Sequence, residues 1–269
     1  MKPRKYILDS TLRDGEQDPG ISFTRSQKLK IAALLDAAGV YQIEAGTPAA
    51  SAFEKETVVR ILENRKQAVI SVWARLTASD MEHAIGCAPD LIHVSVPVSP
   101  SHIYAKLKKN KDWVMKQLRR CLELGRKSGI PMSVGLEDSF RADRAFVLAA
   151  AKAAAELGVA RIRLSDTVGI ATPANCRETV TAVLDALDGR AELGIHAHDD
   201  LGMAVANTLE ALKAGCLFAD TTMTGIGERA GNCDFAKLLQ AGGRLFDWGI
   251  SPAAANRARR GFNEVMEGG

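Results

Sequence analysis

Two histidines separated by a single residue are the feature of this sequence that is most able to do chemistry. His196 and His198 follow the apolar run at residues 193–195. Residues i and i+2 of a strand point to the same face, so both imidazole rings can reach one metal ion. Imidazole is a common ligand of borderline divalent metals. The pair therefore predicts half of a metal site, and a polar pair at a strand end is the alternative interpretation.

The rest of the chain alternates between short apolar runs and longer helical patterns. Eight runs predict strands, at residues 6–9, 41–45, 68–74, 91–96, 132–137, 160–165, 193–198 and 218–223. Between them, apolar residues recur at the three-and-four spacing of helices, as in 27–38, 112–128 and 144–157.

This alternation predicts an α/β fold, and the count of eight favours a closed (β/α)8 TIM barrel. A doubly wound open sheet is the alternative, but residues 9–14 contain no Gly-rich phosphate turn. We expect one catalytic domain over residues 1–269, with the barrel at about 5–245 and a helical tail at about 250–266.

Polar residues follow several of the predicted strands. Arg13 and Asp14 come after the first strand, Glu44 ends the second and Glu137 ends the fifth. Active sites of TIM barrels lie at the carboxyl ends of the strands, so these side chains are expected to meet the histidines. Asp14 or Glu137 could supply the carboxylate of a two-His-one-carboxylate site. The alternatives are a helix cap or ion pair for Asp14 and a structural hydrogen bond for Glu137.

Composition and charge exclude several classes of protein. Aromatic residues make up 5% of the chain and are not interleaved with basic ones, which argues against a nucleic-acid platform. The basic run at 106–111 is expected to be a solvated helix start, and an anion contact is the alternative. The five cysteines form no C-x-x-C pair, and no apolar run reaches membrane-spanning length. We expect a cytoplasmic protein that contacts neither nucleic acid nor membrane.

Four blocks of the sequence resemble the metal-dependent Claisen-condensing barrels, namely the isopropylmalate, homocitrate and citramalate synthases. The blocks are residues 9–17, 166–173, 193–202 and 225–233, and Ser10 stands where threonine is usual. Residues 73–76, 96–99 and 161–164 look most like nitrogenase-associated homocitrate synthases. The resemblance implies an acyltransferase that condenses acetyl-CoA with a 2-oxo dicarboxylic acid, converting 2-oxoglutarate into homocitrate.

The resemblance also implies the ligands of a divalent ion, which could be Zn, Mn, Mg or Fe. Asp14, His196 and His198 match the ligand positions, and Asn232 matches a fourth or outer ligand. Each of these residues offers an oxygen or nitrogen atom that suits such ions to differing degrees.

Further matches imply catalytic and substrate contacts. Arg13 would polarise the oxo carbonyl and stabilise the alkoxide, and Glu137 would assist proton transfer at the acetyl methyl group. Thr167 would hold a carboxylate of the oxo acid. The residues implied to contact substrate are Gln17, Glu44, Arg75, Arg163, Gly225, Gly227 and Gly231. For Arg75 and Arg163 a structural ion pair is the alternative.

One departure from the resemblance bears on the partners of the chain. The synthases continue into a helical region whose His-Glu-Ala-Gly-x-His block supplies a catalytic histidine, often to the neighbouring subunit. His83, His93 and His102 do not stand in such a block. The chain is therefore expected to be a compact synthase, the barrel subunit of a split synthase, or a barrel that binds metal and oxo acid without condensing them.

Several alternatives of activity and assembly stay open. We expect a homodimer, with a separate subunit for the missing half as the alternative. An isopropylmalate- or citramalate-type synthase would use another 2-oxo acid. The lyase branch shares the fold but typically lacks the pair that stands here as Glu16 and Gln17, which argues against an acyl-CoA lyase.

Overall fold

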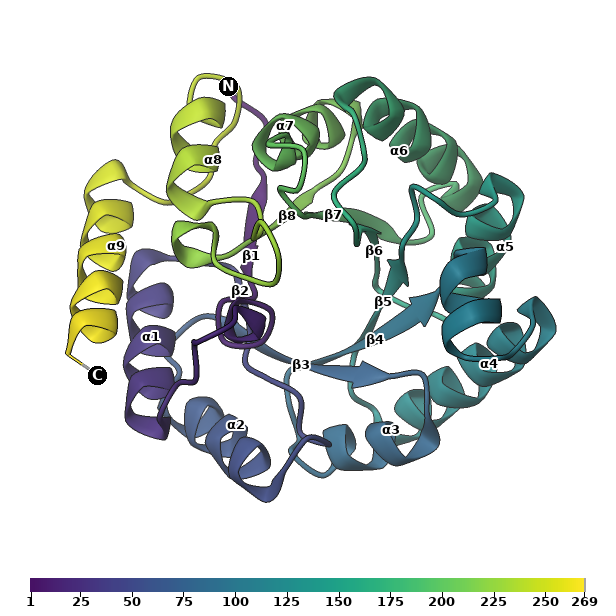
Figure 1. Ribbon diagram of the computed structural model, residues 1–269, viewed down its shortest axis with the longest axis horizontal. Coiled ribbons are helices and arrows are strands. Elements are labelled where there is room, and N and C mark those ends of the chain that lie inside the picture. The colour runs from purple at the N-terminus through teal and green to yellow at the C-terminus, as the bar shows by residue number, and fades with distance from the viewer. Residues whose placement is uncertain (269) are drawn as a thin grey trace.

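The computed structural model describes residues 1–268, which form a closed barrel of parallel strands in the order β1 to β8. Figure 1 shows the strands as a central ring with the helices outside it. The strands are β1 (Tyr6–Asp9), β2 (Gln42–Glu44), β3 (Val69–Arg75), β4 (Leu91–Pro97), β5 (Met132–Glu137), β6 (Arg161–Asp166), β7 (Glu192–Ala197) and β8 (Phe218–Thr221). The predicted fold class is confirmed, and Gly269, the last residue of the predicted domain 1–269, lies outside the described residues.

Helices follow the strands and cover the outside of the barrel. They are α1 (Arg25–Ala38), α2 (Ala52–Asn64), α3 (Ala78–Ile85), α4 (Lys111–Ser128), α5 (Arg144–Glu156), α6 (Pro173–Leu187), α7 (Ala204–Ala214), α8 (Phe235–Gly242) and α9 (Pro252–Glu267). Three short helical turns lie in the connections: η1 (Gly15–Gln17), η2 (Ser101–Lys106) and η3 (Met223–Gly225). Among residues 1–268, no helix is long and apolar enough to cross a membrane.

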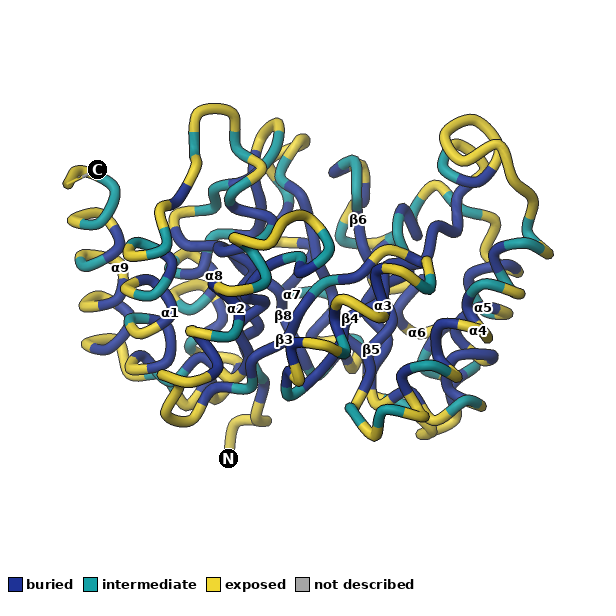
Figure 2. The backbone as a smooth tube through the Cα atoms, turned by 90° about the horizontal axis from the view of Figure 1, so that it is seen from below, coloured by how far each residue is buried: buried dark blue, intermediate teal, exposed yellow. Residues whose placement is uncertain are grey.

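Side chains alternate along each strand between the surrounding helices and the barrel interior. On β6, Ile162 and Leu164 are fully buried in the hydrophobic core. Arg163 lies between them in sequence and reaches across the barrel to Glu44 on β2, with 3.0 Å between Nη1 and Oε2. Figure 2 shows the strands as the buried centre of the molecule. Polar side chains therefore fill part of the barrel interior, and those nearest the strand ends open into one mouth.

Local signals explain where the helices begin and end. Thr24 forms a capping box with Gln27 at the start of α1, and Thr172 caps α6 ahead of Pro173. Gly39 follows α1 with φ 89°, a left-handed conformation that glycine adopts without strain. These caps place the helix termini without help from the tertiary fold.

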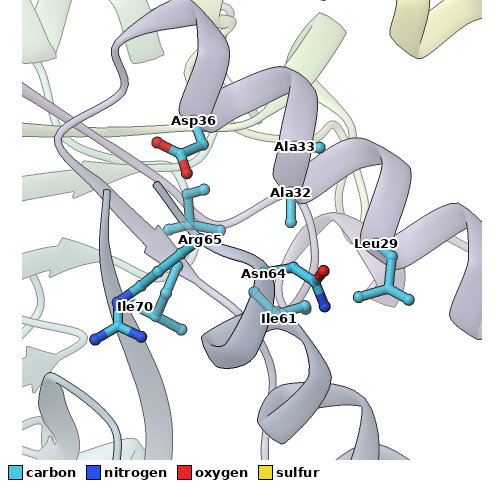
Figure 3. A pocket seen from close by; sticks show the side chains of 9 residues that line it. Leu29, Ala32, Ala33, Asp36, Ile61, Asn64, Arg65 and Ile70 are labelled. Atoms are coloured by element: carbon cyan, nitrogen blue, oxygen red, sulfur yellow. The ribbon is translucent and has the colours of Figure 1, made fainter. Parts of the chain in front are cut away.

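A small cavity between α1, α2 and β3 illustrates how the outer layer is held together (Figure 3). Asp36 at its edge accepts hydrogen bonds from the backbone amides of Lys66, Gln67 and Ala68. The carboxylate thereby satisfies three donors of the connection into β3, and this cavity plays a structural part.

The predicted helical tail is α9, which packs against α1 (Figure 1). A side chain at Gly261 would lie 2.7 Å from Leu34 of α1, so glycine permits this close approach. The tail covers the side of the barrel and leaves its mouth open.

Candidate active site at the mouth of the barrel

The predicted metal ligands converge at the carboxyl ends of β1 and β7. The two Nε2 atoms of His196 and His198 lie 3.2 Å apart. The Oδ2 atom of Asp14 lies 3.4 Å from the first and 3.7 Å from the second. Bonds of about 2.0–2.1 Å to one ion would place neighbouring ligand atoms about 3.0–3.4 Å apart. The three buried side chains can therefore hold a single divalent ion.

The second histidine lies one residue beyond its strand, where the sequence had predicted the strand to continue. β7 ends at Ala197, and His198 instead forms an isolated antiparallel bridge with Asn232. The neighbouring amide of Cys233 donates to the carbonyl of Ala197 at 3.1 Å. This bridge keeps the backbone extended, so the two rings still share a face.

Three buried polar atoms of this cluster have no hydrogen-bond partner among residues 1–268. They are Oδ2 of Asp14, Nδ1 of His198 and Oδ1 of Asn232. Buried polar atoms are nearly always paired, so an unpaired carboxylate oxygen and amide oxygen indicate a ligand. Both atoms have lone pairs suited to a divalent cation, and the donor set fits such an ion.

The glycine-rich loop 225–231 shapes the backbone around Asn232. Gly225 and Gly231 have φ of 74° and 86°, in the left-handed region. A side chain on Gly227 would lie 2.1 Å from Nδ2 of Asn232, which donates to the carbonyl of Ile226 at 3.0 Å. The structure thus gives these three glycines a role in seating Asn232, and their predicted contact with substrate stays a prediction.

Sequence reasoning missed Asp220, which orients one of the histidines. Its Oδ2 atom lies 3.0 Å from Nδ1 of His196, and its Oδ1 atom accepts from Ser10 at 2.8 Å. A carboxylate behind a ligating histidine sets the tautomer and raises the basicity of the ring. The available signal was the alternation along β8, which points Phe218 and Asp220 to the same inward face.

The surrounding charges shift the pKa values of the two histidines in opposite directions. Burial lowers the pKa of His196, but the negative charges of Asp220 and Asp14 and the hydrogen bond with Asp220 outweigh burial and raise that pKa to about 9. Burial and then the positive charge of His196 lower the pKa of His198 to about 4. Burial opposes ionisation of Asp14, but Arg13 and His196 hold its pKa well below the usual value. Compared with two neutral histidines, the cluster therefore carries one additional proton, on His196, which a bound cation would displace.

Arg13 is held between two carboxylates. Its Nη1 atom lies 2.5 Å from Oδ1 of Asp14, and its Nε atom lies 2.6 Å from Oε1 of Glu44. The other oxygen of Glu44 pairs with Arg163, which also pairs with Asp220 at 2.6 Å. Burial would raise the pKa of Glu44, but the two arginines hold it well below its usual value. Glu44 and Arg163, predicted to contact substrate, are thus joined in an ion-pair network that aligns Arg13.

Glu137 ends β5 and Thr167 directly follows β6, the neighbouring strand of the barrel. The backbone amide of Asp138 donates to Oγ1 of Thr167 at 2.8 Å, which leaves the hydroxyl hydrogen free to donate elsewhere. Ser95 donates to Oε2 of Glu137 at 3.1 Å, and His102 lies 2.9 Å from Oε1. Both predicted residues are therefore present at the mouth with spare hydrogen-bonding capacity.

Two of the predicted substrate residues lie apart from the ligand cluster. Nε of Arg75 donates to Asp80 at 2.8 Å, and its side chain is 61% exposed. It lines a cavity of about 220 Å³ that Trp73 and Glu137 also line. Gln17 is exposed at the end of η1. The amide of Gln17 donates to the carbonyl of Asp14 at 3.0 Å, but its exposed side chain forms no hydrogen bond with the side chains of Asp14 or the two histidines.

A buried lysine ties the loop that carries the predicted ligand Asp14 to the helices. Nζ of Lys28 lies 2.6 Å from a carboxylate oxygen of Glu16 and 2.6 Å from one of Glu54, and its side chain is fully buried. Glu54 in turn packs against Gly46, where a side chain would lie 2.0 Å from its Oε1 atom. The triad therefore joins the connections that follow β1 and β2.

Replacing Lys28 with methionine is expected to lower the free energy of unfolding by about 3 kcal/mol, because removing one partner leaves buried charge uncompensated. Urea denaturation measures this. Lys30→Met, at an exposed position of the same helix, is the matched control and should change little. Equal losses in both variants would show that the triad contributes nothing specific.

Known proteins resemble this chain over most of its length. The model of the HMGL-like family matches residues 4–244. The chain is 42% identical to homocitrate synthase subunit alpha of Clostridium pasteurianum, over 87% of this chain and 86% of that subunit. It is 43% identical to homocitrate synthase of Frankia alni, of which it covers 66%. It is 39% identical to 2-isopropylmalate synthase 2 of Caldanaerobacter subterraneus subsp. tengcongensis, of which it covers 61%.

Solved structures repeat the architecture at lower sequence identity. An HMG-CoA lyase of Acenitobacter baumannii, solved with coenzyme A and 3-methylmalate, superposes with a TM-score of 0.86 over 98% of this chain and 92% of that chain. The identity is 19%, so this likeness concerns the fold alone.

Proposed function

Because this chain belongs to the HMGL-like family, we propose that it is an acyltransferase that condenses acetyl-CoA with a 2-oxo acid. The observation that carries the proposal is the convergence of Asp14, His196 and His198 beside Arg13 at the barrel mouth. Four relatives at 36–43% identity are named as synthases, which favours condensation over the lyase alternative.

Asp14, His196 and His198 would hold a divalent ion, with Asn232 as a fourth or outer ligand. Such an ion, when bound, supplies Lewis acidity to the carbonyl of a chelated 2-oxo acid. Asp220 would keep His196 in the tautomer whose Nε2 lone pair faces the ion. Zn, Mn, Mg and Fe are all compatible with this mixture of nitrogen and oxygen ligands.

The chain's own residues would carry the proton and charge transfers. Glu137 accepts a proton from the acetyl methyl group, and the resulting enolate attacks the oxo carbon to form a carbon–carbon bond. Arg13, already aligned by Glu44, stabilises the negative charge that develops on the carbonyl oxygen before that oxygen is protonated. Thr167 donates to a carboxylate of the oxo acid. Water then attacks the thioester, the carbon–sulfur bond breaks, and CoA leaves as the thiol.

2-Oxoglutarate is the oxo acid that we propose, with homocitrate as product. Two of the most similar relatives are named homocitrate synthases. Arg75 is the cation that we place near the second carboxylate, because its side chain is 61% exposed while Arg163 is neutralised by two acids. An isopropylmalate- or citramalate-type substrate is the alternative, since relatives of both kinds share 39% identity.

The subunit composition is a further part of the proposal. The Clostridium relative that this chain matches over 86% of its length is named as one subunit of its enzyme. That name favours a barrel subunit completed by a second polypeptide over a self-sufficient homodimer. Acetyl-CoA and the oxo acid would then bind at a mouth that both polypeptides line.

We place the protein in the cytoplasm. All five cysteines are free and buried, and burial raises the pKa of the Cys121 thiol to about 11 and of the Cys176 thiol to about 12. Unpaired, protonated thiols are typical of a reducing compartment.

The test is a panel of 2-oxo acids with purified, metal-replete protein and acetyl-CoA, followed by release of the CoA thiol. We expect release that requires both the oxo acid and a divalent ion and that is fastest with 2-oxoglutarate, alone or after addition of a candidate second subunit. Faster release with 2-oxoisovalerate or pyruvate would reassign the substrate. Cleavage of a hydroxyacyl-CoA without any oxo acid would assign a lyase, and no release under any condition would overturn the proposal.

A further inference from the structure

We propose that His102 is a positioning residue for Glu137, whose carboxylate it aims for removal of the acetyl proton. This inference rests on the proposed function for its consequence in catalysis, but the contact itself can be tested separately. Sequence reasoning left His102 without a role, because it does not stand in the His-Glu-Ala-Gly-x-His block of the synthases.

The backbone after β4 places the imidazole rigidly. Residues 101–106 form one turn of π-helix, in which the amide of Leu107 donates to the carbonyl of His102 at 3.0 Å. The amide of His102 donates to Oγ of Ser99 at 3.3 Å, and the fully buried Ile103 anchors the turn in the core. Single π-helical turns are uncommon and occur frequently at functional sites.

The ring and the carboxylate are in direct contact. Nδ1 of His102 lies 2.9 Å from Oε1 of Glu137, while Ser95 donates to Oε2 at 3.1 Å. Nδ1 has no aligned hydrogen-bond partner among residues 1–268, so with its proton on that atom a small rotation of the ring makes the imidazole a donor to Glu137. Each carboxylate oxygen has two lone pairs, so both oxygens keep one for an incoming proton. The side chains of Glu137, His102 and Ser95 all line the cavity of about 220 Å³, so the base faces open space.

The other charges near this contact do not replace the imidazole. Lys106 lies 3.8 Å from Glu137, but its side chain is 67% exposed and therefore well screened. Nε2 of His102 lies 4.0 Å from Asp138, whose carboxylate is already paired with Arg141 at 2.7 Å. His102 is thus the partly buried polar side chain closest to Oε1 of Glu137.

This arrangement explains why Glu137 is ionised although it is largely enclosed. Burial raises the pKa of Glu137, but the close approach of His102, and then the charge of Lys106 and the hydrogen bond from Ser95, outweigh burial and lower that pKa. A charged carboxylate is the form that can accept the acetyl proton. The chain therefore carries a histidine of its own beside the base.

The first measurement is the titration of Glu137 itself, by carbon NMR of ¹³C-labelled glutamate, with Glu137→Gln to assign the signal. His102→Leu keeps the volume but has no donor, and we expect it to raise the pKa of Glu137 by about one to two pH units. His102→Asn places an amide nitrogen near the position of Nδ1 and should restore most of the lowering. His83→Leu, on α3, is the matched control and should leave the titration unchanged.

The second measurement is the pH profile of thiol release with acetyl-CoA and 2-oxoglutarate. The acidic limb should move upward in His102→Leu by the same one to two pH units or so, with kcat lowered and the KM for the oxo acid unchanged. Asparagine should return the limb towards that of the wild type.

The two measurements separate the two proposals. An unchanged Glu137 titration in His102→Leu would overturn the role of His102 even if the wild type condenses both substrates. A shifted titration in a protein that releases no thiol would support the contact and overturn the proposed function. Equal effects of leucine and asparagine on both readouts would show that His102 only packs the turn.

Discussion

His198→Ala is expected to lower the affinity for Mn²⁺ or Zn²⁺ at least about 100-fold, because changes even to residues behind metal ligands cost 10- to 100-fold. The reason lies in the geometry of the cluster. Nε2 of His198 lies 3.2 Å from Nε2 of His196 and 3.7 Å from Asp14, so it is one of three atoms that can reach one ion. Calorimetry or metal analysis of the purified variant measures the loss.

Two further variants belong in the same experiment, one expected to have an intermediate effect on metal affinity and one that serves as a control. Asp220→Asn keeps all three ligands but weakens the acceptor behind His196, so its affinity should fall between those of His198→Ala and the wild type. His83→Ala removes a histidine of α3 and should bind the ion like the wild type. Wild-type stoichiometry and affinity in a folded His198→Ala protein would refute the metal site.

Arg13→Lys is expected to lower kcat by about 100- to 1,000-fold while the bound metal is retained, because removal of one oxyanion donor typically costs this much. Lysine keeps the positive charge between Asp14 and Glu44, but all its donors are on one nitrogen, so it lacks the planar fork with which Arg13 contacts the two carboxylates through separate nitrogens. The effect should therefore fall on the reaction, where negative charge develops, more than on the KM for the oxo acid.

Arg60→Lys is the matched control for this substitution. Arg60 lies on α2 with 55% of its side chain exposed, and the change should leave kcat within error of the wild type. Arg13→Lys would contradict the assignment if it raised KM alone, since Arg13 would then only bind the substrate. Loss of metal together with activity would instead show that Arg13 mainly keeps Asp14 ionised.

Local sequence patterns predicted the presence and order of all eight strands correctly, but they predicted the first and last residues of the strands less accurately. β1 and β5 have the predicted bounds, β2, β3, β6 and β7 differ by one residue at both ends, and β4 and β8 differ by one and two residues at the carboxyl end. The run 218–223 divides into β8 and η3, because the amide of Thr222 turns to the carbonyl of Cys233. Such pairings with a distant loop leave no trace in the local apolar pattern.

In the candidate site, too, some residues were predicted from the sequence and others were not. Asp14, His196, His198 and Asn232 were predicted and lie together. Asp220 was missed, although it contacts His196 directly. Nothing in the local sequence indicates which side chain an acidic residue of an apolar strand will contact in the barrel.

Patterns in the sequence predict the fold class, the ends of most helices and the types of ligand at the mouth. These features depend on periodicity, on caps such as Thr172 with Pro173, and on residues that follow strands. Which acidic side chain pairs with which basic one follows only from the folded barrel. Glu44 and Arg163 are 119 positions apart, and closure of the barrel brings them to 3.0 Å. The same closure places His196 against Asp220 and His102 against Glu137, because these contacts depend on strand order and register rather than on sequence spacing.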